Sequence, residues 1–211
     1  MIQPAANTPL PHRSKALSAP SRIIRGLLIA ASSCLLFATG SMQAQEQVDL
    51  GYEFARGKLT ELSNMKTTLS IPAFADERDV EDPRTIITGE LAEGGVALAE
   101  RPFAEIVGEA MKAGFAASNA KLESEGAGFR LAGTITATEA AIVDRGGVES
   151  LQLTLRTSIQ LIEGTRIVWQ TKLFGRGTVP STDGIAAATN KAIDRLIEEL
   201  LIDDYFLAEI R

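Results

Sequence analysis

The stretch Glu149–Gly177, ESLQLTLRTSIQLIEGTRIVWQTKLFGRG, decides the fold of this chain. Its first half alternates leucine and isoleucine with glutamine, threonine, serine and arginine, which is the period of a strand with one buried and one wet face. Glu163 and Gly164 interrupt the alternation, and the second half carries the only tryptophan, Trp169. The stretch therefore predicts a long β-hairpin that has a core side and a water side.

Further strands are predicted before the hairpin. Apolar residues alternate with polar ones at 48–54, 67–74 and 129–138. Pro72 has no N–H to donate, so we expect it at a sheet edge or a bulge. Glycine-containing connections are expected through 89–95 and over 175–184, the second of these directly after the hairpin.

Two helices are predicted from apolar residues at helical spacing. One follows Pro102 and ends at Gly114, and the other runs from Ile185 to about Leu201 with Thr182 or Asp183 as its cap. Successive strands with one polar face, and helices to cover the other, indicate an α+β fold. We expect a two-layer sandwich, with a mainly antiparallel sheet of about four to five strands and two helices packed on one face.

The first 44 residues have the composition of a secretory signal peptide. They contain four basic residues and no acidic one, followed by an apolar run from Leu27 to Ala38 and then small residues. The apolar run is too short to span a membrane comfortably. We therefore divide the chain into a signal peptide at 1–44, an N-terminal extension or strand at 45–66, and a single α+β domain at 67–211.

Removal of this leader would remove the only histidine, His12, and the only cysteine, Cys34. The remaining chain could not use a Ser–His or Cys–His pair, thiolate chemistry or an ordinary zinc site. We expect no enzyme activity, no metal and no cofactor. The remaining 17 basic and 27 acidic residues give a net charge of −10, which argues against a nucleic-acid partner.

Cys34 allows two interpretations. It could accept a lipid anchor, but Ala31-Ser32-Ser33 lacks the leucine that usually stands three residues before a lipidated cysteine, and the apolar run continues through Phe37. This pattern favours an ordinary residue inside the signal core. Membrane attachment is expected only through a lipidated Cys34 or an uncleaved leader.

Residues 76–84, DERDVEDPR, form the densest charge cluster. The cluster could bind calcium or a partner, or Asp76 and Glu81 could work as a general acid and base in a hydrolase. The EF-hand order is absent, and charge clusters are common on surfaces. We favour a solvated loop whose acids are partly paired with Arg78 and Arg84.

The order of these segments resembles the YajG-type bacterial envelope lipoproteins. The similarity runs over roughly 48–211 and rests on Leu69-Ser70-Ile71, Asp76-Glu77-Arg78, Gly114-Phe115 and the closing segment DDYFLAEI at 203–210. It implies an export signal, an α+β periplasmic domain and usually an outer-membrane lipid anchor, with no established enzyme activity. The poor lipidation motif around Cys34 is where this chain departs from that family.

Two functions follow as hypotheses for an exported protein in the periplasm or at the outer membrane. The first is a noncatalytic module that binds another envelope protein through an exposed strand edge or the polar face of the hairpin; the alternative is that this face is simply hydrated. The residues of that face are Gln152, Thr154, Arg156, Ser158, Gln160, Gln170 and Lys172. The second is a carrier or transport-auxiliary protein that holds a lipid or other apolar ligand near Phe103, Met111 and Trp169.

Overall fold

The computed structural model describes residues 45–54 and 60–211, so the predicted signal peptide, with His12 and Cys34, lies outside the described residues. The strands and helices follow one another as β1 (Glu46–Val48), β2 (Leu69–Ser70), β3 (Ala75–Asp76), β4 (Thr85–Thr88), β5 (Val96–Ala99), α1 (Phe103–Ala117), β6 (Phe129–Asp144), β7 (Glu149–Glu163), β8 (Arg166–Pro180), α2 (Gly184–Leu201) and α3 (Asp204–Ile210). Short 3₁₀ turns precede β5 and α2.

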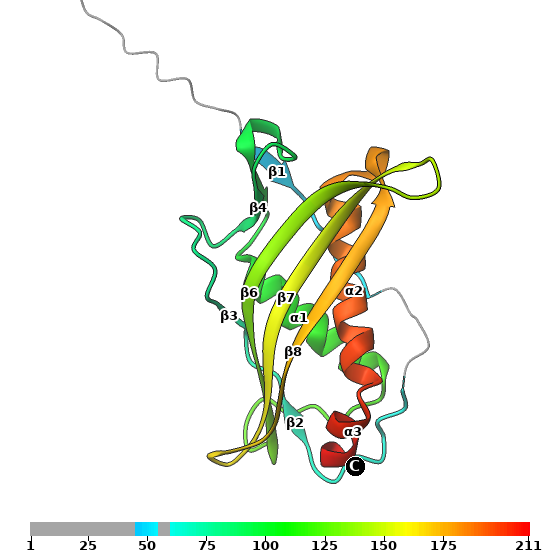
Figure 1. Ribbon diagram of the computed structural model, residues 1–211. Coiled ribbons are helices and arrows are strands. Elements are labelled where there is room, and N and C mark those ends of the chain that lie inside the picture. The colour runs from blue at the N-terminus through cyan, green and yellow to red at the C-terminus, as the bar shows by residue number, and fades with distance from the viewer. Residues whose placement is uncertain (1–44, 55–59) are drawn as a thin grey trace, which may run out of the picture. The chain divides into compact units, whose positions relative to one another are not determined.

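A five-stranded sheet forms the centre of the domain. Its order is β2-β6-β7-β8, and β3 also pairs with β6. Strands β6, β7 and β8 are antiparallel, whereas β2 and β3 are parallel to β6. The helices lie on one side of this sheet (Figure 1). The predicted α+β class is confirmed, and the hairpin closes with Glu163 opposite Arg166.

The edge position expected for Pro72 is confirmed, because Pro72 separates β2 from β3 along the outer edge of β6. The loop predicted at 175–184 is wrong over its first half, since β8 continues to Pro180. Gly175 and Gly177 lie on the core face, and a Cβ atom there would collide with the carbonyl oxygens of Ala192 and Ala188 in α2. These glycines permit a close approach of helix and strand, and do not turn the chain.

Helix α1 buries the predicted apolar face, but it does not end at Gly114. A Cβ at Gly114 would meet the side chain of Ile197, so this glycine lets α1 and α2 approach closely in the last turn of α1. The prediction that the side chain of Thr182 or Asp183 caps α2 is also wrong. The helix begins after Asp183, and no side chain there accepts a capping hydrogen bond. By contrast, Asp203 caps α3 by accepting from the N–H of Phe206 at 2.8 Å.

A second, three-stranded sheet of order β1-β5-β4 was not predicted. Its strands β4 and β5 lie directly before and after the glycine-containing connection expected through 89–95, and neither strand was predicted. Their sequences, TIIT and VALA, are short and mostly buried, so they lack the alternation that reveals a half-exposed strand. The strand expected at 48–54 forms only at Glu46–Val48, where it runs parallel to β5.

After β1, the chain is tied to α2 by two hydrogen bonds. Asn190 Nδ2 donates to the carbonyl of Leu50 at 2.7 Å, and the Tyr52 hydroxyl donates to Asp194 Oδ1 at 2.7 Å. Burial, followed by this bond to a carboxylate, raises the pKa of Tyr52 far above its ordinary value. The N-terminal segment is therefore an integral part of the domain's packing.

The core lies between the five-stranded sheet and the helices. Phe103, Phe115 and Phe206 are fully buried there, and the rings of Phe115 and Phe206 meet edge to face, with centroids 5.9 Å apart. Trp169 packs against this core with a half-buried ring, which lies 5.1 Å from the ring of Phe206 in α3. Among the described helices, none combines the length and apolar composition that crossing a membrane requires.

Candidate binding surface on the sheet

Strands β6, β7 and β8 present one face that no helix covers within the described residues, and we call it the outer sheet face. The ladder places its side chains in register, for example Ser158 opposite Lys172 and Gln160 opposite Gln170. All seven predicted contact residues lie on this face: Gln152, Thr154, Arg156, Ser158, Gln160, Gln170 and Lys172. Their grouping follows from the period of two, while their role in binding remains a prediction.

The seven residues differ in how accessible they are. Arg156, Gln170 and Lys172 are exposed, whereas Thr154 keeps only 5% of its surface. Thr154 sits in the middle strand with Glu139 opposite it on β6 and Arg176 opposite it on β8, and these longer side chains cover it. Thr154 therefore supports the face, and the cations and amides around it offer most of the contact area.

Three further residues of the outer sheet face were not among the predicted ones. Phe174 is 50% exposed and Ile167 is 47% exposed, so both side chains offer apolar area to a partner. The Arg176 guanidinium lies 5.5 Å from the centre of the Phe174 ring, within reach of a cation–π contact. Phe174 alternates with Gln170 and Lys172 along β8, whereas Arg176 lay in the segment predicted as a loop.

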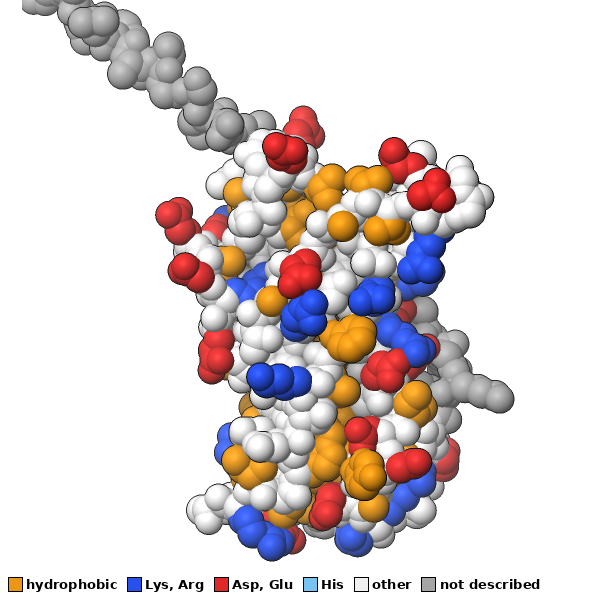
Figure 2. Space-filling model, viewed as in Figure 1, with side chains coloured by type: hydrophobic (Ala, Val, Ile, Leu, Met, Phe, Trp, Pro, Cys, Tyr) orange, Lys and Arg blue, Asp and Glu red, His pale blue; other side chains and the backbone are white. Residues whose placement is uncertain are grey.

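The outer sheet face is basic although the domain is acidic. Within the described residues, and leaving out the ends of the strands beside the connecting turns, the charged side chains of this face are Arg130, Arg156, Lys172, Arg176 and Glu139. Glu139 pairs with Arg156 at 3.2 Å, and neither Lys172 nor Arg176 has an ion pair with a described residue. Figure 2 shows Lys and Arg side chains across this face beside hydrophobic ones. The local field therefore favours an acidic partner.

Two shallow hollows meet at Lys172 on this surface. One measures about 340 Å³ and is lined by Ser158, Gln170 and Lys172 with the chain between them. The other, of about 240 Å³, lies between Arg156, Lys172 and Phe174. Their walls combine cations, an amide and an aromatic ring, which suits protein side chains better than a small molecule enclosed on all sides.

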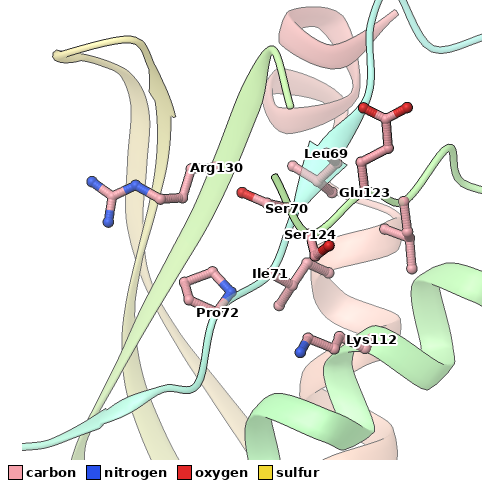
Figure 3. A pocket seen from close by; sticks show the side chains of 9 residues that line it. Leu69, Ser70, Ile71, Pro72, Lys112, Glu123, Ser124 and Arg130 are labelled. Carbon is pink, nitrogen blue, oxygen red and sulfur yellow. The ribbon is translucent and has the colours of Figure 1, made fainter. Parts of the chain in front are cut away.

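A larger hollow of about 400 Å³ lies at the opposite edge of the sheet, beside β2 (Figure 3). Its lining comes from Leu69, Ser70, Ile71, Pro72, Lys112, Leu122, Glu123, Ser124 and Arg130. Lys112 points toward Ile71, while the guanidinium of Arg130 is directed away from Pro72. The Ser70 hydroxyl donates to the Phe129 carbonyl at 3.4 Å. The polar groups do not converge on one point, so the hollow defines no reaction.

The three residues predicted to hold an apolar ligand occupy different environments. Phe103 and Met111 have no exposed surface. The ring of Phe103 instead lies 5.1 Å from the guanidinium carbon of Arg78. Trp169 is half-buried and lines a shallow surface hollow of about 310 Å³ with Ile167 and its neighbours in β8. Phe103 and Met111 thus serve the core, and no observation at these residues favours a carrier.

The acidic cluster is paired, as predicted, but one of its pairs is more buried than a solvated loop would be. Asp82 bonds Arg84 at 2.6 Å near the surface, whereas Asp76 bonds Arg78 at 2.7 Å with the Arg78 side chain only 4% exposed. Arg78 also donates to the Thr138 hydroxyl of β6. Burial would raise the pKa of Asp76, but the hydrogen bonds and charge of Arg78 hold it below its ordinary value.

This pairing makes Asp76 a structural anchor and a poor general acid, because its proton affinity is lowered. Within 45–54 and 60–211, no cluster of acidic, histidine or cysteine side chains is arranged to hold a metal ion.

No family model matches the sequence, and no curated protein matches it. Among solved structures, the chain is similar to the DUF330-family protein XCC0632 from Xanthomonas campestris, with a TM-score of 0.53 and 16% identity over 74% of this chain and 91% of that one. It is less similar to the hypothetical protein CT253 from Chlamydia trachomatis, with a TM-score of 0.43 and 10% identity over 68% and 95% of the two chains.

A minor lipoprotein from Acinetobacter baumannii has a TM-score of 0.38 and 10% identity over 68% of this chain and 92% of that one. At these identities the similarity to XCC0632 shows a shared fold. Function must be argued from the surface of this chain.

Proposed function

We propose that this chain is an exported, noncatalytic accessory module of the bacterial cell envelope, and that it binds an acidic surface of another envelope protein through the outer sheet face. One observation carries the proposal: the uncovered side of the sheet is basic in an acidic domain, with Lys172 and Arg176 on either side of the exposed Phe174. The predicted export signal and the YajG-type resemblance support the compartment, and intact-mass analysis of the native protein would test signal cleavage and lipidation at Cys34.

The composition of this surface suits recognition. Arginine and aromatic residues are enriched at the centres of protein interfaces, because they bury much area and offer directional contacts. Phe174 with Arg176 stacked beside it is such a pair. The cations would also speed association with an acidic partner, and this contribution weakens as salt rises.

The proposal of a noncatalytic role rests on the chemistry of the domain. The sequence places its histidine and cysteine in the predicted leader, so the domain itself contains neither. Of the two carboxylates considered as a general acid and base, Asp76 and Glu81, Asp76 is held by Arg78. Charged and amide groups on the outer sheet face can bind a partner without either residue type.

The test compares two charge reversals in capture experiments from envelope extracts, followed by quantitative mass spectrometry. Lys172→Glu lies on the outer sheet face, and Lys112→Glu, the matched control, lies exposed on α1. We expect Lys172→Glu to lose at least about tenfold of the captured acidic partner, and Lys112→Glu to retain it. High salt should weaken wild-type capture in the same way. Equal capture by both variants would refute the outer sheet face as the binding surface.

A further inference from the structure

The open edge of β8 is continuous with the outer sheet face. Strand β8 is the last strand of its sheet, and over its 15 residues it pairs only with β7 among the described elements. An edge strand of this length presents a row of backbone N–H and C=O groups to any extended chain that approaches it. The edge can therefore add directional backbone bonds to whatever the side chains of the face attract.

The direction of these backbone groups follows from two contacts. Lys191 Nζ donates to the Thr178 carbonyl at 2.9 Å, which shows that this carbonyl points away from β7. Pro180, two residues further along β8, lies opposite Ser150 and has its backbone turned the same way as that of Thr178. Because an N–H at this position would point away from β7, the N–H that proline lacks removes no hydrogen bond between β7 and β8. The register is uninterrupted from Pro180 back to Trp169, so alternate residues share this direction. They are Gln170, Lys172, Phe174 and Arg176.

The residues that present free backbone groups are the same ones that place side chains on the outer sheet face. In each case the side chain and the outward backbone belong to a single site. Lys172 and Arg176 lie on either side of Phe174 at alternate positions, and β8 contains basic residues and no acidic one. A strand paired here would place its own alternate side chains directly beside these three.

A second copy of this chain is a poor occupant of the edge. If two β8 strands paired antiparallel about Phe174, Lys172 of each would face Arg176 of the other. Like charges directly opposite each other destabilise a strand pair. The charge pattern instead fits a strand with acidic side chains at the two outer positions.

We propose that the partner supplies an extended segment that adds to β8 as a further strand, with acidic residues at positions i and i+4 and an aromatic or aliphatic residue at i+2. The acids then face Lys172 and Arg176, and the central residue packs on Phe174. This inference rests on the proposed function and names the binding mode and the recognised pattern. Strand addition of this kind takes affinity from main-chain bonds and specificity from alternate side chains.

The test uses three synthetic peptides at low ionic strength. The palindromic peptide acetyl-TETYTET-amide can add in either direction with both acids and the tyrosine on one face. Acetyl-ETTYTTE-amide has the same composition, but its acids fall on the face opposite the tyrosine, and acetyl-TKTYTKT-amide reverses the charge. We expect the first peptide to bind at least about tenfold more tightly than the second, and the third not to bind.

Amide hydrogen exchange, followed by NMR, reports the binding mode. With the first peptide bound, the outward amides of Lys172, Phe174 and Arg176 should slow, whereas those of Thr171 and Leu173, which already face β7, should change little. The double variant Lys172→Glu with Arg176→Glu should reverse the peptide specificity, so that it binds acetyl-TKTYTKT-amide in preference to acetyl-TETYTET-amide. Unchanged protection of Leu173 in that variant shows that it still folds.

Each alternative outcome is distinct. Equal binding of the first two peptides, or binding that leaves the three outward amides unprotected, would overturn strand addition while leaving the outer sheet face as the proposed surface. Protection that rises with protein concentration and without peptide would overturn the acidic segment in favour of a second copy. Failure of the proposed function itself would be seen in the capture experiment, as equal capture by Lys172→Glu and Lys112→Glu.

Discussion

The two faces of the β6-β7-β8 sheet differ in nearly every physical respect although they belong to the same strands. On the core face, Leu153, Leu155 and Leu161 have no exposed surface, and glycines in β8 bring α2 against the backbone. On the outer sheet face, neighbouring residues in the same strands are exposed cations and amides around Phe174. Stability and recognition are therefore assigned to alternate residues, so a substitution can test one with little effect on the other.

The largest expected difference lies between two adjacent residues of β7. Leu155→Ala removes a fully buried side chain beneath α2, and we expect a loss of about 4 kcal/mol in the free energy of unfolding. Arg156→Ala on the outer sheet face breaks an exposed ion pair with Glu139 and should cost no more than about 0.5 kcal/mol. Urea denaturation measures both. Similar losses in the two variants would mean that the outer sheet face is also packed in solution.

The close approach of α2 to β8 gives the next largest effect. Gly177→Val places a branched side chain against the backbone of Ala188 and should destabilise the fold by about 3 kcal/mol. The control is Thr178→Val, one residue along on the outer sheet face, where a similar shape has room. Thermal unfolding should separate the two variants by many degrees. A stable Gly177→Val protein would show that α2 does not pack as closely as described.

The ion pair between Asp76 and Arg78 beside β6 should contribute less to the free energy of unfolding. Asp76→Asn leaves the buried Arg78 without its carboxylate and should cost about 2 kcal/mol at pH 7, less than a fully buried pair because Asp76 keeps 16% of its side-chain surface. Arg78 holds the pKa of Asp76 low, so this stability is present above the ordinary pKa of an aspartate, 3.8, and is lost as pH falls below it.

Unfolding experiments from pH 7 to pH 3 should therefore show the gap between wild type and Asp76→Asn closing with acidification. The control is Asp82→Asn, whose partner Arg84 lies nearer the surface and whose loss should change stability little. A gap that widens as the pH falls would contradict this account of the pair.

The smallest expected effect concerns the N-terminal segment on α2. Tyr52→Phe removes the hydroxyl that donates to Asp194 and should cost about 1 kcal/mol, with no change in capture by the outer sheet face. Asn190→Ala, which removes the neighbouring bond to the Leu50 carbonyl, should have a similar effect. Hydrogen exchange of residues 50–54 would report the loosening. No change in either variant would mean that these two hydrogen bonds do not hold the segment on α2.

The contact surface illustrates how far the sequence alone could lead. The alternation along β7 and β8 correctly grouped Arg156, Gln170 and Lys172 on one face, because the strand period does not depend on what packs against it. It could not show that Thr154 is covered by its neighbours, nor that Arg176 belongs to the face. To place Arg176 on this face, one must know that the glycines on either side of it lie in a strand.

The short strands of the small sheet escaped prediction for a related reason. The runs TIIT and VALA are buried on more than one side, and a short buried run has no alternation to distinguish a strand from a connection. Their assignment depends on the pairing of β5 with β4 and with β1, and β1 lies far from β5 along the chain. Pairing over such distances is a tertiary property.

The sequence by itself determined the hairpin, its two faces, the apolar sides of both long helices and the absence of histidine and cysteine outside the predicted leader, because these depend on local period and composition. Only the tertiary structure decided that Gly114, Gly175 and Gly177 are points of helix contact and that Asp76 is an anchor with Arg78. From sequence alone, a glycine indicates a turn, and only its neighbour in space shows that it permits a helix contact. A charged residue likewise indicates a solvated surface until its burial is known. The open edge of β8 likewise became visible only when the order of the strands was known.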